Sequence, residues 1–172
     1  MLDLGCGCGY TTAAISKNFS KSNVHGVDIS ADAISFAKRN FLSEKISFSR
    51  ESVSTNKNFI VTYDFIFCFE FYPFSRSNNL IFQLNYIKYL LGNLEYAGKI
   101  IIYQAITFNF LKNITSIKKQ HRYINIRIKF IPNLKVLKIF RIKWIALFLC
   151  FIIQAILRRS FVNIVVEVSN FS

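Results

Sequence analysis

Three glycines at alternate positions near the start of the chain constrain the fold more than any other feature. They belong to the stretch DLGCGCG, Asp3 to Gly9, which follows a short apolar segment and precedes a helical pattern. Glycine in a strand-to-helix loop lets the backbone adopt positive φ and approach a ligand closely. The start of the next helix offers free N–H groups and a partial positive charge, which suit a carboxylate or a phosphate. The loop therefore predicts an α/β fold with a ligand site after its first strand.

The first hundred residues alternate strand-like and helix-like patterns, which is typical of a doubly wound, mostly parallel sheet with crossover helices. Strands are predicted over residues 1–4, 23–28, 45–50, 61–70 and 97–106. We expect Thr11 or Thr12 to cap the first helix, which ends near Phe19, and Ser30 to cap the second. A further helix is indicated by apolar residues at helical spacing: Leu80, Leu84, Ile87 and Leu91.

Beyond residue 106 the pattern is less regular. We predict a helix from Phe108 to Gln120, a strand over 123–131 that Pro132 ends, a basic and hydrophobic helix over 134–158, and a last strand over 160–168. No repeat and no linker composition divides the chain, so we expect a single domain over residues 1–172. In that domain residues 1–106 form the ligand-binding core, and residues 107–172 complete the sheet.

The positive charge lies in the C-terminal part of the chain. Residues 1–100 hold ten Lys and Arg against eight Asp and Glu, whereas residues 101–172 hold twelve against one, Glu167. A region of one sign favours an anionic partner, either nucleic acid or an anionic membrane surface. The apolar run from Trp144 to Leu157 has fourteen residues, fewer than the roughly 20 that span a bilayer. We therefore predict that residues 134–159 pack on the sheet or make peripheral contact with an anionic membrane, without crossing it.

The four cysteines, Cys6, Cys8, Cys68 and Cys150, have neither the spacing of a disulfide framework nor a paired CxxC pattern. A reducing compartment suits them, and the start of the chain has no secretory pattern, so we expect a cytoplasmic location. Cys6 and Cys8 have no second Cys or His pair near them in sequence. We predict no metal site.

Two ligand classes compete for the glycine loop, namely dinucleotides and S-adenosylmethionine. The spacing is GxGxG, whereas a dinucleotide site is expected to show GxGxxG. Asp3 at the strand end would repel a pyrophosphate but attract the ammonium group of S-adenosylmethionine. Asp28 closes the second predicted strand, where a carboxylate can accept hydrogen bonds from both ribose hydroxyls of an adenosine. That role suits NAD equally, so Asp3 and the glycine spacing favour the sulfonium compound.

The motifs in their order resemble the class I, Rossmann-like S-adenosylmethionine-dependent methyltransferases over residues 1–106. MLDLGCGCGYTT is similar to the first motif of that family, VHGVDIS to the second and YDFIFCFEFYPF to the fourth. The resemblance implies methyl transfer from S-adenosyl-L-methionine, with Asp28 on the ribose and Ile29 on the adenine. Where the family has a shorter acid against the adenine amino group, this chain has Glu51. The implied cofactor-binding residues are Asp3, Gly5, Cys6, Gly7, Gly9, Asp28, Ile29, Glu51, Ser52 and Phe69.

The methyl acceptor is less constrained. Enzymes of the family that methylate amino groups of nucleic acids carry an Asn/Asp-Pro-Pro-aromatic motif, whereas this chain has FEFYPF with Pro73 alone. We therefore expect a small molecule, a sugar or a lipid-linked acceptor, with nucleic acid as a further alternative. Glu70 and Tyr72 lie at the right end of the sheet for a base, and Glu70 can equally well have a structural role in the turn between strand and helix. His25 is expected to pack inside a strand. We assign no catalytic residue.

A rival hypothesis is a non-catalytic protein. Family members normally carry several tens of residues before the first strand, and here the chain begins in that strand, so we expect a truncation relative to the family. A cofactor-binding remnant, or a module of the membrane surface, would keep the glycine loop without turnover.

Overall fold

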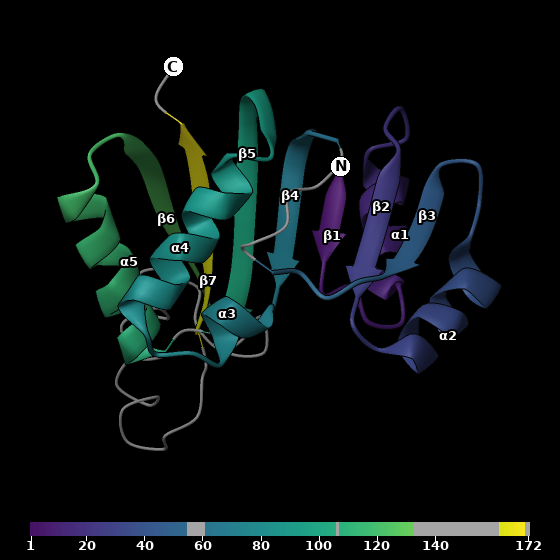
Figure 1. Ribbon diagram of the computed structural model, residues 1–172, viewed down its shortest axis with the longest axis horizontal. Helices are drawn as coiled ribbons and strands as arrows, with labels where there is room; N and C mark the ends of the chain where they lie inside the picture. The colour runs from purple at the N-terminus through teal and green to yellow at the C-terminus, as the bar shows by residue number, and fades with distance from the viewer. Residues whose placement is uncertain (55–60, 106, 133–161, 171–172) are drawn as a thin grey trace, which may run out of the picture.

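The computed structural model describes residues 1–54, 61–105, 107–132 and 162–170. They form one seven-stranded sheet with the order β3-β2-β1-β4-β5-β7-β6 (Figure 1). The strands are β1 (Leu2–Leu4), β2 (Val24–Asp28), β3 (Ile46–Arg50), β4 (Tyr63–Phe69), β5 (Leu94–Ala105), β6 (Ile124–Pro132) and β7 (Val162–Asn170). The helices are α1 (Tyr10–Asn18), α2 (Ala31–Phe41), α3 (Tyr72–Ser75), α4 (Leu80–Leu91) and α5 (Phe108–Gln120).

The strand order confirms the predicted doubly wound sheet. Strands β1 to β5 pair in parallel, and β7 lies antiparallel between β5 and β6. From β1 the chain winds outward first to β2 and β3 and then, on the other side, to β4 and β5. The order therefore reverses beside β1, and ligands of open α/β sheets bind at such a reversal, at the carboxyl ends of the strands.

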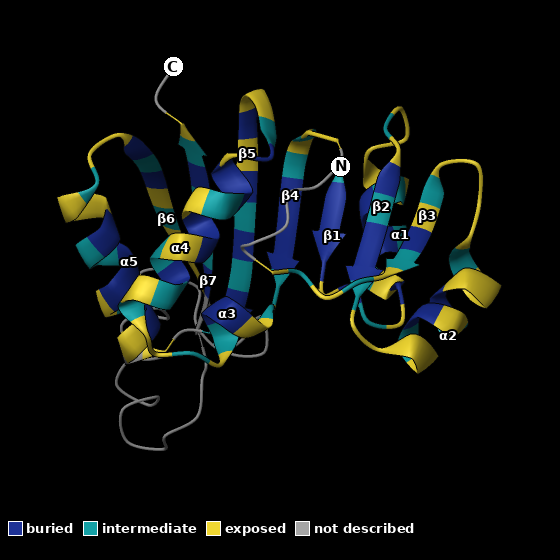
Figure 2. Cartoon of the chain, in the orientation of Figure 1, coloured by how far each residue is buried: buried dark blue, intermediate teal, exposed yellow. Residues whose placement is uncertain are grey.

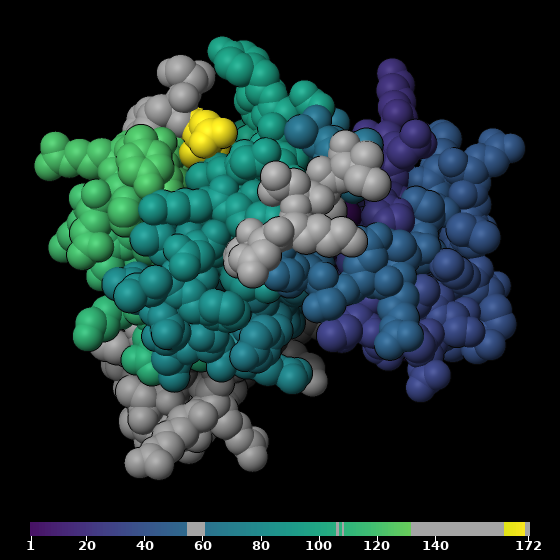
Figure 3. Space-filling view, viewed as in Figure 1, coloured from purple at the N-terminus to yellow at the C-terminus, as the bar shows by residue number. Residues whose placement is uncertain are grey.

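Helices cover both faces of the sheet. In Figure 1, α3, α4 and α5 lie in front of the sheet and α1 lies behind it. Figure 2 shows the strands between these layers as mostly buried. The main core joins apolar residues of the central strands to α4 and α5, and it includes Ile66, Ile102, Ile87, Leu90 and Ile114. In the space-filling view, α4 and α5 form the left-hand mass of this face and the residues up to β3 form the right-hand mass (Figure 3).

The caps of the first two helices differ from each other. The prediction that Thr11 or Thr12 caps α1 is wrong. Gly9 occupies the N-cap position with a left-handed backbone, and among the described residues no side chain accepts a hydrogen bond from the first turn of the helix. Both threonine hydroxyls instead donate to the buried carboxylate of Asp3, which needs donors more than the helix end does. The Ser30 cap of α2 is confirmed, since its hydroxyl accepts a hydrogen bond from the Ala33 N–H at 3.2 Å.

The C-terminal predictions are confirmed where the structure describes the chain. Helix α5 spans the predicted residues, and β6 and β7 fall within two residues of the predicted strands. Strand β5 begins three residues earlier than predicted, at Leu94, and passes through Ala97 with φ of 61°. The helix predicted over 134–158 and its membrane contact lie outside the described residues. Within the described ranges, no helix is long and apolar enough to cross a membrane.

Candidate functional site

A cleft of about 590 Å³ opens at the carboxyl edge of the parallel strands, a volume typical of small-molecule sites. The loops after β1, β2, β3 and β4 contribute to its walls, together with one residue of α4. Five of the predicted site residues line it, namely Gly5, Asp28, Ile29, Glu51 and Ser52. The topology therefore brings together residues that are up to 47 positions apart in the sequence.

The glycine loop after β1 needs its glycines for two different reasons. Gly5, Gly7 and Gly9 all have positive φ, of 72°, 51° and 84°, a region that side-chain-bearing residues rarely adopt. At Gly9 space is also missing, because a Cβ there would lie 2.9 Å from the Ala37 Cβ and from the Phe48 ring. At Gly7 nothing lies within 4 Å of such a Cβ. The loop is thus packed tightly against α2 and β3 at Gly9, whereas at Gly7 there is space for a side chain.

Asp3 lies directly before this loop and is fully buried. Its Oδ2 accepts hydrogen bonds from the Thr11 and Thr12 hydroxyls at 2.8 and 2.7 Å. Its Oδ1 has no hydrogen-bond partner among the described residues. Burial raises the pKa of the Asp3 carboxyl, against the opposing effect of the two hydroxyls. A buried carboxylate oxygen without a donor is costly, so Oδ1 is an acceptor that a further hydrogen-bond donor would stabilise.

Asp28 connects the glycine loop to the start of α2. Its Oδ2 accepts from the Gly7 N–H and its Oδ1 from the Ser30 N–H, both at 2.9 Å. Each carboxylate oxygen has a further lone pair, so Asp28 can still accept from hydroxyls of a ligand. The neighbouring Ile29 side chain is 67% exposed at the cleft, which gives the site an apolar surface beside a carboxylate.

Glu51 belongs to a hydrogen-bonded row of side chains that the sequence analysis missed. The Ser49 hydroxyl donates to Glu51 Oε1 at 2.8 Å, and His25 Nε2 lies 2.8 Å from the same hydroxyl. His25 was expected to be a packed core residue, but it is half-buried and bonded to serines at both ring nitrogens. The signal in the sequence was the alternation of Ser47, Ser49 and Glu51, which places polar groups on one face of a strand.

The other five predicted cofactor residues are not among those that line the cleft: Asp3, Cys6, Gly7, Gly9 and Phe69. Of these, Asp3 lies buried directly before the glycine loop, whereas Cys6 and Phe69 pack into apolar clusters. The Cys6 side chain is buried beside Ala37 and Phe48, and burial together with Asp3 raises the pKa of its thiol to about 12. Phe69 stacks on Phe67 with ring centroids 5.8 Å apart, in a separate core cluster. Any role of these two residues in binding stays a prediction. Within the described ranges, no three His, Cys, Asp or Glu side chains gather in a way that could hold a metal ion.

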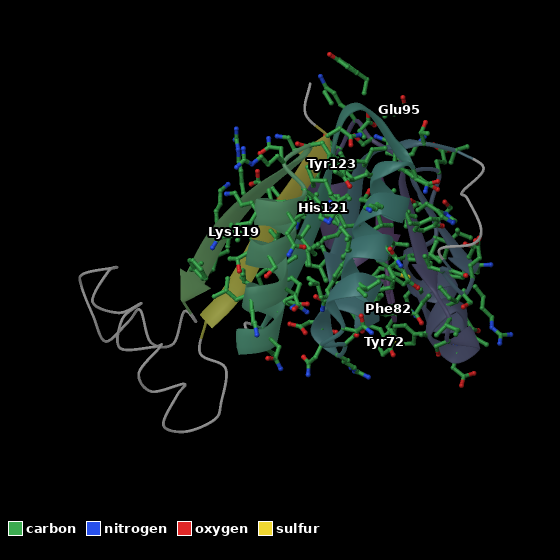
Figure 4. All side chains as sticks on the ribbon, turned by 60° about the vertical axis from the view of Figure 1, so that its left-hand side comes forward. Tyr72, Phe82, Glu95, Lys119, His121 and Tyr123 are labelled. Atoms are coloured by element: carbon green, nitrogen blue, oxygen red, sulfur yellow. The ribbon has the colours of Figure 1, made fainter. Side chains whose placement is uncertain are left out.

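The loop after β4 forms the opposite wall of the cleft with side chains that the sequence analysis did not assign to the site. Phe71, Pro73 and Arg76 line this wall together with Tyr72 and Glu70, and Tyr86 of α4 adds to it. Tyr72 is 59% exposed and contacts Phe82 edge to face, with ring centroids 6.3 Å apart. Figure 4 shows these two rings together at the edge of the molecule opposite Glu95.

Glu70 begins this wall with a left-handed backbone, φ 49°, which is unfavourable for a residue with a side chain. Its Oε1 accepts a hydrogen bond from the Ala105 N–H at 2.6 Å, and its carbonyl accepts one from the Ser75 hydroxyl at 2.9 Å. The carboxylate therefore joins the ends of β4 and β5. This bond favours a structural role of Glu70 in the turn after β4 over the role of a base.

Comparisons with known proteins agree with this geometry. Residues 1–84 match a family model described as a methyltransferase domain. The plantazolicin methyltransferase BpumL, solved in complex with SAH, is similar over 99% of this chain and 75% of its own, with 19% identity and a TM-score of 0.63. The N-methyltransferase NodS from Bradyrhizobium japonicum WM9 is similar over 99% of this chain and 85% of its own, with 12% identity and a TM-score of 0.62.

A third similar structure is StiE O-MT, with 17% identity, a TM-score of 0.62, and coverage of 99% of this chain and 68% of its own. No curated protein sequence matches the chain. Identities this low show a shared fold, and the family model adds the sequence motifs of the glycine loop and the strands that follow it.

Proposed function

We propose that this chain, whose residues 1–84 match a methyltransferase domain model, is a class I S-adenosylmethionine-dependent methyltransferase and that its cleft binds S-adenosyl-L-methionine. One observation carries the proposal: the buried Asp3 carboxylate before the glycine loop has an oxygen without a donor. The ammonium group of S-adenosylmethionine is such a donor and also neutralises the charge. A dinucleotide would bring a pyrophosphate to the same place and repel Asp3.

Different residues in and beside the cleft bind different parts of the cofactor. Asp3 and the start of α1 hold the amino-acid end of the cofactor, because the first supplies an acceptor and the second supplies N–H donors. Asp28 accepts from the ribose hydroxyls, and Ile29 packs on the adenine. Glu51 and Ser52 face the rim of the purine. When bound, the sulfonium supplies an already activated methyl group.

The chain itself then has to align an acceptor with that methyl group and exclude water. We place the acceptor against the wall formed by the loop after β4, where Phe71, Tyr72 and Pro73 offer apolar and aromatic surface. Arg76 adds a positive charge to this wall. A small molecule, or the head of a sugar or lipid-linked compound, suits a cleft of this size. BpumL has been solved in complex with a triazolic desmethylPZN analog and SAH, so a protein of this fold binds a second organic molecule together with SAH.

Calorimetry with S-adenosylmethionine, S-adenosylhomocysteine and NAD tests the proposal. We expect both sulfur compounds to bind and NAD not to bind. Asp28→Ala should weaken the binding of S-adenosylhomocysteine by about 1–3 kcal/mol, since charge-assisted hydrogen bonds to the ribose are lost. Binding of NAD without binding of S-adenosylmethionine would refute the cofactor assignment. Binding without methyl transfer to any acceptor would instead support the non-catalytic alternative.

A further inference from the structure

We propose that Ser49 and His25 are positioning residues that hold the Glu51 carboxylate in the cleft as a fixed hydrogen-bond acceptor. The resemblance to the methyltransferase family implies that an acid at this place accepts from the adenine amino group; what we add is that Ser49 and His25 fix its direction, so that a purine with an amino group at C6 is preferred over one with an oxo group. The inference rests on the proposed function, because the purine is that of the bound cofactor.

These side chains and that of Ser47 form one row of four across two neighbouring strands. Ser47, Ser49 and Glu51 alternate along β3 and its end, and His25 on β2 lies opposite Ser47 in the register of the sheet. His25 Nδ1 is 2.8 Å from the Ser47 hydroxyl, and Nε2 is 2.8 Å from the Ser49 hydroxyl. Ser49 then donates to Glu51 Oε1 at 2.8 Å. The row ends in the cleft, which Glu51 lines and the other three residues do not.

The protons in this row can be placed by counting donors. The anionic Glu51 only accepts, so the single hydroxyl proton of Ser49 points to Glu51. His25 Nε2 must then carry a proton and donate it to Ser49. The neutral ring leaves Nδ1 as an acceptor, which Ser47 satisfies. Burial lowers the pKa of His25 and so favours this neutral form.

The row leaves Glu51 with one oxygen fixed and one available. Among the described residues only Ser49 donates to the carboxylate, through Oε1, so Oε2 can accept from a ligand. An amino group at C6 of a purine donates to such an oxygen, whereas an oxo group presents a second acceptor and is repelled. Because Glu51 is longer and has more rotamers than the acid usual at this place, Ser49 and His25 compensate by restricting it.

The test measures binding of S-adenosylhomocysteine and of S-inosylhomocysteine, its 6-oxo analogue, by calorimetry. In the unmodified protein we expect the amino compound to bind about 10–100-fold more tightly, as for the loss of one charge-assisted hydrogen bond. Glu51→Gln should abolish most of this preference, because an amide can donate to the oxo group. Ser49→Ala should reduce the preference to a few-fold.

Variants of His25 separate positioning from a merely structural role. His25→Gln can keep an N–H donor near Ser49 and should retain most of the preference, whereas His25→Leu should lose it to the same extent as Ser49→Ala. The matched control is Ser35→Ala, an exposed serine of α2 that should leave both affinities unchanged. Circular dichroism identifies any variant that fails to fold, and the remaining variants of the row then decide the matter.

The possible outcomes are distinct. If Ser49→Ala and His25→Leu weaken both ligands equally, or leave their ratio unchanged, the row does not position Glu51 and the inference is wrong. If the unmodified protein binds both purines equally, Glu51 does not read the C6 group. If it binds neither ligand, the proposed function itself fails, which is a different result.

Discussion

Among the four loops that contribute to the cleft, the one after β1 and the one after β4 present different chemical groups. The first contributes the backbone of Gly5 to the cleft, and its Gly7 N–H donates to the carboxylate of Asp28, which also lines the cleft. The second presents aromatic rings and the guanidinium of Arg76. Both loops follow neighbouring parallel strands, so they reach the same edge of the sheet.

The difference lies in what determines each loop's shape. The glycine loop is determined by its backbone, because positive φ and the contact at Gly9 exclude side chains. The loop after β4 is determined by side chains, since Glu70 holds an unfavourable backbone by bonding to β5. A backbone-built wall suits a ligand that never changes, and a wall of side chains can be altered without disturbing the fold. This division matches a constant cofactor and a variable acceptor.

Substitution of Gly9 should have the largest effect. Gly9→Ala forces a Cβ to within 2.9 Å of Ala37 and Phe48 at positive φ, and should lower the free energy of unfolding by about 2–5 kcal/mol. Gly7→Ala has the same backbone strain but free space, so about 1 kcal/mol is expected. Chemical denaturation of the two variants measures the difference. Equal losses would show that packing at Gly9 does not determine the loop.

Asp3→Asn should have the next largest effect. It should weaken cofactor binding but raise the stability of the ligand-free protein. We expect S-adenosylhomocysteine to bind about 1–3 kcal/mol more weakly, because the acceptor for its ammonium loses its charge. The same change should stabilise the ligand-free protein at neutral pH, since burial raises the pKa of Asp3 and opposes its ionised form.

The pH dependence provides the control for Asp3. A folded pKa above the ordinary 3.8 means that the folded state keeps this proton when the unfolded state has lost it. The contribution of Asp3 to stability is therefore complete below pH 3.8 and decreases as the pH rises through the folded pKa. Denaturation over this range should show the decrease in the natural chain and not in Asp3→Asn. An unchanged profile would mean that Asp3 is not the titrating group.

The glycine loop after β1 could be predicted from the sequence far better than the loop after β4. Glycine spacing, Asp3 and Asp28 are local signals, and the order of apolar runs predicted the parallel sheet around them. The loop after β4 depends on contacts that no local pattern contains, such as the bond from the Ala105 N–H to Glu70 across 35 residues. The four-residue helix α3 is too short to produce a periodic pattern. The Thr11 and Thr12 prediction failed for a related reason, because a buried carboxylate overrode the usual capping preference.

Glu70 distinguishes a structural carboxylate from a base. Glu70→Ala should lower the free energy of unfolding by about 1 kcal/mol through loss of the bond to the Ala105 N–H. Glu70→Gln keeps an acceptor oxygen and should change stability by less than about 0.5 kcal/mol. Thermal denaturation gives these values. If methyl transfer by Glu70→Gln is lost while stability and cofactor affinity are kept, Glu70 is a base and the structural assignment is incomplete.

The smallest effect on the cofactor should come from Arg76, and it tests the division between the two walls most directly. Its side chain is exposed, and among the described residues it forms no ion pair. Arg76→Ala should therefore alter S-adenosylhomocysteine affinity by less than about twofold, or about 0.4 kcal/mol, while acceptors that carry an anionic group lose affinity for the cofactor-loaded protein. Arg76→Lys, which keeps the charge, should retain part of that affinity. Calorimetry of S-adenosylhomocysteine with the unmodified protein, Arg76→Ala and Arg76→Lys measures the first effect. Titration of the cofactor-loaded proteins with phenyl phosphate and with uncharged benzyl alcohol measures the second. A loss of cofactor affinity similar to that of Asp28→Ala would place Arg76 on the cofactor side, and the two loops would then share one ligand.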